Sequence, residues 1–191
     1  MQSLNASTRA FAALGLVLLM ILTRGQHFAS VDALPSASWA IFFLAGALLS
    51  PWAWFAVLFA LASALDLISL QTGSIAQWCM SPAYWALVPA YGALWGAGRV
   101  YARLHREHLS TLLALGACLL AGATVAYLCS GGGFYFFSGR YPDATLAGFL
   151  PRIAEYLPRH LGNLGLYVGV AALVYAATSP IRDRVVAAAR S

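Results

Sequence analysis

The sequence predicts an all-α integral membrane protein: a bundle of six transmembrane helices forming one domain over residues 1–191, with both termini cytoplasmic. Two observations predict this class. Hydrophobic residues make up 61% of the chain, and charged residues only 9% with no lysine, whereas a soluble domain carries about 25% charged residues. The apolar residues also fall in runs about as long as a bilayer-spanning helix. Too little polar sequence remains to cover a water-facing surface, so the expected solvent is the lipid bilayer.

Serine–proline pairs mark the ends of several apolar runs. Residues 36–70 would form a helix about 52 Å long at 1.5 Å per residue, far more than one crossing of about 30 Å. Ser50-Pro51 divides this run, because serine is a favourable N-cap and proline a favourable first helical residue. The N-terminal run lacks the small-residue cleavage site of a signal peptide, so we expect a retained helix. The expected spans are residues 7–23, 36–49, 51–70, 82–104, 109–129 and 157–178.

The arginines predict which helix ends face the cytoplasm. With both termini on one side, that side receives seven of the eleven arginines and the other side four. An excess of arginine marks cytoplasmic flanks, so the termini are expected inside the cell. The longer connections then lie outside; they are residues 24–35, 71–81 and 130–156.

The third outer connection is expected to be the most elaborate. It contains Gly131-Gly132-Gly133, then an aromatic run over residues 134–137, then a short helix expected after Pro142-Asp143. A connection of this length can fold as a lid over a site.

Charge and motifs exclude several classes of function. The net charge is +5, but the arginines border apolar runs, where they reach lipid headgroups, so no nucleic-acid partner is expected. Without lysine the chain has no P-loop ATPase motif, and it contains no C-x-x-C, H-E-x-x-H or G-x-S-x-G. His105 and His108 have metal-like spacing, but no carboxylate or thiol cluster accompanies them.

Cys79 is the candidate reactive residue. It lies two residues before the helix start expected at Ser81-Pro82. The positive end of a helix dipole favours the thiolate, the form that attacks electrophiles and binds metals. The alternative is that Cys79 is a small hydrophobic residue, the role expected for Cys118 within the fifth span. Cys129, at the outer end of that span, is a candidate disulfide partner of Cys79, and such a bond would exclude a ligand role.

Other polar residues are expected at the same outer level. A carboxylate such as Asp66, within a span, costs about 3 kcal/mol unless it faces protein, water or a partner. His27 lies in the first outer connection, Tyr84 in the first turn of the fourth span, and Arg152 and Arg159 in the third connection, where they can hold phosphate or amide oxygens. The alternatives are a structural hydrogen bond for Asp66, solvent exposure for His27, the interfacial aromatic belt for Tyr84, and headgroup contact for the arginines.

These features together resemble a known family. A chain of this length with six short spans, substantial outer connections and no ATPase is similar to the substrate-binding S-component of energy-coupling-factor (ECF) vitamin transporters. Within that group the chain resembles the BtuM family of solitary cobalamin S-components over essentially its whole length. The residues that carry this resemblance are Trp78-Cys79-Met80, His27, Asp66, Tyr84 and Arg152.

The resemblance implies a function in the bacterial cytoplasmic (inner) membrane. Cobalamin (vitamin B12) would bind at the outer face, with the Cys79 thiolate as an axial ligand of its cobalt, and would then be transported inward. Thiolate ligation is also expected to promote loss of cyanide from cyanocobalamin. An ECF energising module is a candidate partner, although whether one is needed stays open. The expected corrin contacts are Trp78, Tyr84 and Trp85, and the expected hydrogen-bonding residues are His27, Asp66 and Arg152.

Three other functions remain open at this point. The chain could be an S-component for another vitamin, such as riboflavin or thiamine, in which Cys79 is incidental. It could be a membrane thiol enzyme with Cys79 as nucleophile and His27 as base. It could also be a membrane assembly subunit without a ligand.

Overall fold

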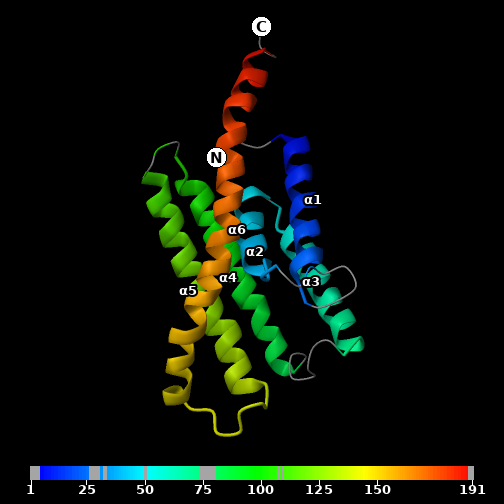
Figure 1. Ribbon diagram of the computed structural model, residues 1–191, viewed down its shortest axis with the longest axis vertical. Helices are drawn as coiled ribbons and strands as arrows, with labels where there is room; N and C mark the ends of the chain where they lie inside the picture. The colour runs from blue at the N-terminus through cyan, green and yellow to red at the C-terminus, as the bar shows by residue number, and fades with distance from the viewer. Residues whose placement is uncertain are drawn as a thin grey trace.

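The computed structural model describes residues 5–25, 31, 34–49, 51–73, 81–106, 108 and 110–188, with side chains to residue 178. These residues form helices and their connections without any strand, which confirms the predicted all-α class. The elements, drawn in Figure 1, are α1 (Ala6–Thr23), α2 (Ser38–Leu48), α3 (Ala53–Gln71), the 3₁₀ helix η2 (Pro82–Ala86), α4 (Leu87–Leu104), α5 (Ser110–Phe137) and α6 (Leu146–Ala188).

Among the described residues, four helices are long and apolar enough to cross a membrane: α1, α3, α5 and the part of α6 up to Thr178. Their outward faces carry large apolar side chains; Phe11 is 74% exposed, Leu113 79% and Leu173 72%. So much exposed apolar surface is unfavourable in water and favourable in lipid. The chain is therefore a membrane protein.

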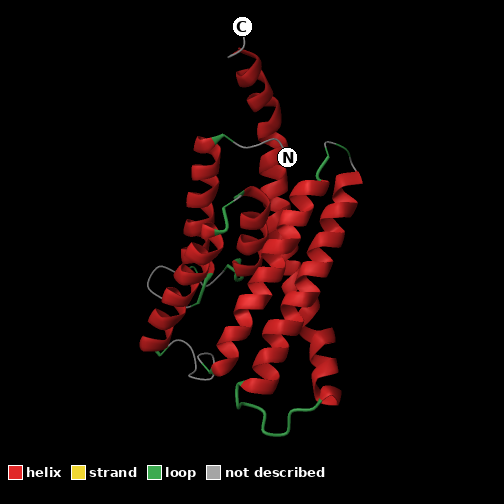
Figure 2. Cartoon of the chain, turned by 180° about the vertical axis from the view of Figure 1, so that it is seen from behind, coloured by secondary structure: helices red, strands yellow, loops and turns green. Residues whose placement is uncertain are grey.

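Helix α2, the shortest α-helix among the described residues, forms the centre of the bundle. It is apolar on all sides, and Ile41, Phe42, Phe43 and Ala45 are completely buried. A helix without a polar face is stable only where other helices surround it. Helices α1, α3, α4 and α6 all contact α2, and Figure 2 shows the helices arranged around it from the other side.

Two glycines allow α2 and α4 to pack backbone against backbone. A Cβ atom on Gly46 would overlap the carbonyl oxygen of Trp95, and one on Gly98 would overlap the carbonyl oxygen of Phe43. Small residues at such crossings let helix backbones approach closely, which is how helices commonly associate in lipid. The pair α2–α4 is therefore fixed by residues that cannot be enlarged.

The connection predicted over residues 130–156 is much shorter in the structure. Helix α5 continues through Gly131–Gly133 to Phe137, and α6 begins at Leu146, so the expected loop over 130–156 reduces to residues 138–145. The glycines serve packing rather than a turn, because a Cβ on Gly133 would overlap the Cβ of Ala86 in η2. The expected lid is replaced by a helical hairpin, and the short helix expected after Pro142-Asp143 is the first part of α6.

Tertiary packing also explains why α6 starts early. Phe149 is buried against Tyr127 and Tyr135 of α5, and its backbone N–H donates to the carbonyl of Thr145 in the first helical turn. These contacts extend the helix through Pro151, a residue type that usually interrupts one.

The end of the sixth span was also wrong, because α6 continues past the predicted end at residue 178 to Ala188. The breaks predicted at the two earlier Ser-Pro pairs agree closely with the structure. Helix α2 ends at Leu48 and α3 begins at Ala53, on either side of the predicted break at residues 50–51. The fourth helix begins at Pro82 as expected, but as 3₁₀ helix, and the hydroxyl of Ser81 makes no capping hydrogen bond.

Helix α1 begins and α6 ends at the same end of the bundle (Figure 1). At the opposite end α3 finishes, η2 starts, and residues 138–145 join α5 to α6. We call this the hairpin end.

Replacing Gly98 by alanine should destabilise the protein, because the added methyl group must displace the carbonyl of Phe43. Overpacking of this kind costs about 1–3 kcal/mol. Gly96→Ala is the matched control, because a Cβ at that position has nothing within 4 Å, and it should leave stability unchanged or raise it by up to about 1 kcal/mol. Apparent melting temperatures in detergent measure both; equal values for the two variants would contradict the packing described.

Candidate functional site

A buried ion pair between Arg24 and Asp66 joins the end of α1 to α3. Nε of Arg24 donates to Oδ1 of Asp66 at 2.9 Å, and Nη2 donates to Oδ2 at 2.6 Å. The Arg24 side chain is 9% exposed and that of Asp66 15%. Two parallel N–H···O bonds of this type are among the strongest charge-assisted contacts in proteins. Asp66 is therefore the intramembrane acid that the sequence predicted, and its partner is an arginine.

The remaining terminal nitrogen of Arg24 binds two other helices. Nη1 donates to Oγ of Ser38 on α2 and to the hydroxyl oxygen of Tyr91 on α4, both at 2.8 Å. Burial alone lowers the pKa of the guanidinium, but its interactions with Tyr91 and Asp66 outweigh that effect and raise the pKa above its ordinary value. Arg24 therefore stays charged and connects α1 to α2, α3 and α4.

The local backbone explains how Arg24 reaches this position. Arg24 is the C-cap of α1, and its N–H donates to the carbonyl of Met20. Gly25 follows with φ of +65°, a left-handed conformation that glycine adopts without strain and that commonly ends a helix. The chain thus turns away directly after Arg24, and the guanidinium is left among the other helices.

Tyr84 adds η2 to this network. Its hydroxyl donates to Oδ2 of Asp66 at 2.8 Å, and it lies 3.2 Å from Oγ of Ser63. Tyr84 and Asp66, both predicted site residues, are therefore in direct contact. We call Arg24, Ser38, Asp66, Tyr84 and Tyr91 the polar cluster.

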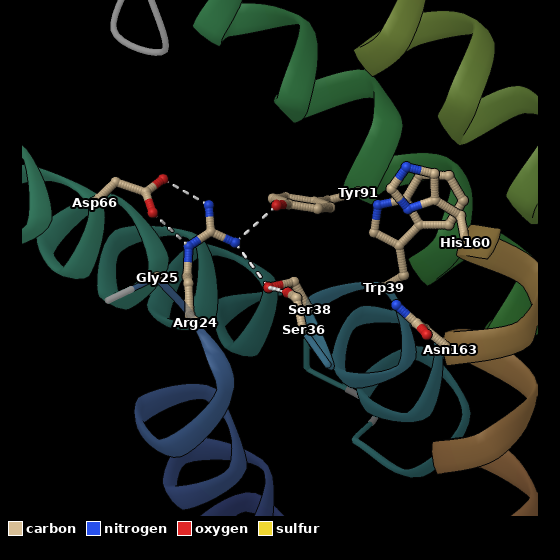
Figure 3. Close-up of a pocket in the computed structure, with 9 residues that line it drawn as sticks. All are labelled: Arg24, Gly25, Ser36, Ser38, Trp39, Asp66, Tyr91, His160 and Asn163. Atoms are coloured by element: carbon tan, nitrogen blue, oxygen red, sulfur yellow. Dashed lines mark hydrogen bonds and ion pairs between the residues drawn. The ribbon is translucent and has the colours of Figure 1, made fainter. Parts of the chain in front are cut away.

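A cavity of about 280 Å³ opens beside the polar cluster. On the side away from Asp66, Trp39 of α2 stacks on His160 of α6 with ring centroids 4.5 Å apart and an interplanar angle of 12°. Figure 3 shows the ion pair on one side of the cavity and this stack on the other, with Tyr91 between them. The lining residues are Arg24, Gly25, Ser36, Ser38, Trp39, Asp66, Tyr91, His160 and Asn163.

Two other predicted site residues lie away from the cavity. Trp85 is 71% exposed and does not line it. Arg152 belongs to an aromatic cluster at the hairpin end, where it donates to the hydroxyl of Tyr141 at 2.8 Å and lies over the rings of Tyr135, Tyr141 and Tyr156. The geometry thus unites Asp66 with Tyr84 but not with Arg152 or Trp85.

The remaining predicted residues, His27, Trp78 and Cys79, lie outside the described part of the chain. Of the other thiols, Cys118 is buried in the core, in keeping with its predicted role as a small hydrophobic residue, and Cys129 is a half-buried free thiol. No group of three His, Cys, Asp or Glu residues suited to a metal occurs within the described ranges.

Sequence reasoning missed most of the cavity wall. One signal was available for Arg24: Asp66 is an acid within an apolar run and needs a partner, and Arg24 lies at the same predicted outer level. No spacing of residues along the sequence indicates the other residues of the cavity wall, because they come from separate helices that meet only in the folded structure. The residues missed are Arg24, Ser38, Trp39, Tyr91, His160 and Asn163.

Comparison with known proteins does not identify the chain. No protein-family model matches it, and no curated protein matches it either.

Asp66→Asn should destabilise the protein by about 3–5 kcal/mol, because it leaves the buried Arg24 charge without its counter-charge. Tyr84→Phe removes the hydroxyl's contacts with Asp66 and Ser63 but no charge, and should cost less, about 1–2 kcal/mol. Denaturant unfolding in detergent, followed by circular dichroism, gives both values. The double variant Arg24→Met with Asp66→Leu should recover most of the loss, and an Asp66→Asn protein as stable as wild type would show that the pair contributes nothing.

Proposed function

We propose that this protein is a membrane uptake protein for cobalamin. In this proposal cobalamin binds at the hairpin end of the bundle, and the thiolate of Cys79 becomes an axial ligand of the cobalt. The ligand then passes inward across the membrane. The proposal combines the sequence resemblance with the position of the polar cluster.

The hydrogen bond between Tyr84 and Asp66 is the observation that carries the proposal. Asp66 lies near the end of α3 and Tyr84 in η2, the two elements that flank Cys79 in the sequence. Their 2.8 Å contact holds the two ends of that connection together beside the cavity. In this proposal the thiol on that connection meets a ligand held by the polar cluster.

A neutralised polar cluster suits a large, amide-rich, uncharged ligand. The arginine and the aspartate cancel each other's charge, while hydroxyls of Ser38, Tyr84 and Tyr91 surround them. Such a site offers hydrogen bonds at low electrostatic cost to a neutral ligand. The corrinoid of cobalamin has this character, because primary amides surround its apolar macrocycle.

The proposal includes a location and an orientation. Six spans would cross the bacterial cytoplasmic membrane, with α2 and the η2–α4 segment as the two shorter or less apolar crossings. The excess of arginine near the termini favours the hairpin end outside. An ECF energising module would dock on the opposite side if transport requires one.

Titration of the purified protein with cobalamin should produce an absorption band that depends on the thiol, because sulfur bonding to cobalt changes the ligand field. Cys79→Ala should abolish the band. Cys129→Ala is the matched control, since it removes a half-buried free thiol from α5, and it should leave the band unchanged.

Failure of that band to appear, or its persistence in Cys79→Ala, would contradict the proposal, and so would two results with other ligands. Tight binding of riboflavin or thiamine, with no corrin band, would assign the chain to another vitamin. Turnover of a cobalt-free substrate with covalent labelling of Cys79 would make it a thiol enzyme.

Cyanocobalamin should lose its cyanide on binding. The Cys79 thiol would give up its proton as sulfur bonds to cobalt, a Co–S bond would form and the Co–C bond would break. The proton and the cyanide would leave as hydrogen cyanide, and the cobalt would keep its oxidation state. Cyanide release, measured against Cys79→Ser, should occur only with the thiol; equal release by both proteins would contradict this step.

A further inference from the structure

The cavity beside the polar cluster is too small for a whole corrinoid. Its volume is about 280 Å³, whereas pockets for drug-sized ligands measure about 300–1,000 Å³, and a corrinoid is larger than such ligands. Only a side arm of the ligand can enter. The residues of the wall then decide which kind of arm is accepted.

We propose that the cavity is a subsite for a primary carboxamide arm of the ligand, and that Asn163 and His160 of α6 select it. This inference rests on the proposed function, because it names the part of the cobalamin periphery that enters the bundle.

The wall contributed by α6 offers unused hydrogen-bonding groups. Asn163 and His160 both line the cavity, and within the described part of the chain the side chain of neither forms a hydrogen bond or an ion pair. A side-chain amide presents two N–H donors and a carbonyl acceptor, and a neutral imidazole presents one donor and one acceptor. A primary carboxamide has the same two kinds of group and can pair with both residues.

The wall is also held rigidly. His160 and Asn163 are three residues apart on α6 and therefore lie on one face of the helix. The stack of His160 on Trp39 ties this face to α2, and the hydroxyl of Tyr167 donates to the carbonyl of Pro35 at 2.6 Å, just before α2. A pre-organised wall loses little entropy on binding.

Charge favours an amide over a carboxylate. The two carboxylate oxygens of Asp66 already occupy the Nε and Nη2 side of Arg24, and Ser38 and Tyr91 occupy Nη1. An incoming carboxylate would find no free arginine fork and would lie near the negative charge of Asp66. A neutral amide avoids both penalties.

The test compares cobalamin with its monocarboxylic derivatives, in which one primary amide is hydrolysed to an acid. Wild-type protein should bind at least one of these derivatives about ten-fold or more weakly than cobalamin, corresponding to one lost or repelled hydrogen-bonding group. This measurement needs no variant, so folding defects cannot obscure it. Equal affinity for cobalamin and every derivative would overturn the inference.

The same assay on variants locates the subsite. Asn163→Leu should weaken cobalamin binding about ten-fold. It should also reduce the difference in affinity between cobalamin and its monocarboxylic derivatives, and it should keep the thiol-dependent band. Thr178→Val, a polar-to-apolar change at an exposed position on the same helix, is the matched control and should bind like wild type.

The outcomes separate this inference from the proposed function. Suppose that the wild-type protein shows the thiol-dependent band, but Asn163→Leu and His160→Ala bind cobalamin as tightly as wild type. That result would overturn the subsite and leave the proposed cobalamin binding intact. A wild-type protein that binds no cobalamin would overturn both.

Discussion

The buried ion pair between Arg24 and Asp66 is the interaction on which the rest of the site depends. Either charge alone would be costly within an apolar bundle, and together they form two hydrogen bonds and leave no net charge. Because Arg24 also binds Ser38 and Tyr91, and Asp66 accepts from Tyr84, one pair sets the relative positions of α1, α2, α3, α4 and η2. The polar cavity exists because these helix ends cannot move apart without breaking the network.

The packing beneath this network keeps the cavity in place. Helix α2 carries Ser38 and Trp39 into the site, and its buried apolar residues fix it among four neighbours. Backbone contact at Gly46 and Gly98 holds α2 against α4, so that Tyr91, stacked on Phe42 at 4.2 Å, projects beside Arg24. The polar cluster is thus positioned by helices rather than by loops, which favours a precise site.

The sequence predicted correctly those features that depend on a few neighbouring residues. The break near Ser50-Pro51 and the start at Pro82 follow from proline's fixed backbone and missing N–H, and Asp66 was recognisable because a carboxylate within an apolar run needs a partner. The same reasoning was wrong for Gly131–Gly133 and for the start of α6, where contacts with Ala86 of η2 and among Tyr127, Tyr135 and Phe149 determine the helix. Sequence reasoning could not find Tyr91, His160 or Asn163. These residues come from different helices, so no regular spacing along any one helix marks them as parts of one cavity wall.

An experimental structure of the protein with bound cobalamin tests the account most directly. The account predicts cobalt bonded to the sulfur of Cys79 and one carboxamide arm of the corrin lying between Asn163 and the Arg24–Asp66 pair. A corrinoid bound elsewhere, with the sulfur of Cys79 facing lipid or joined to Cys129, would contradict it.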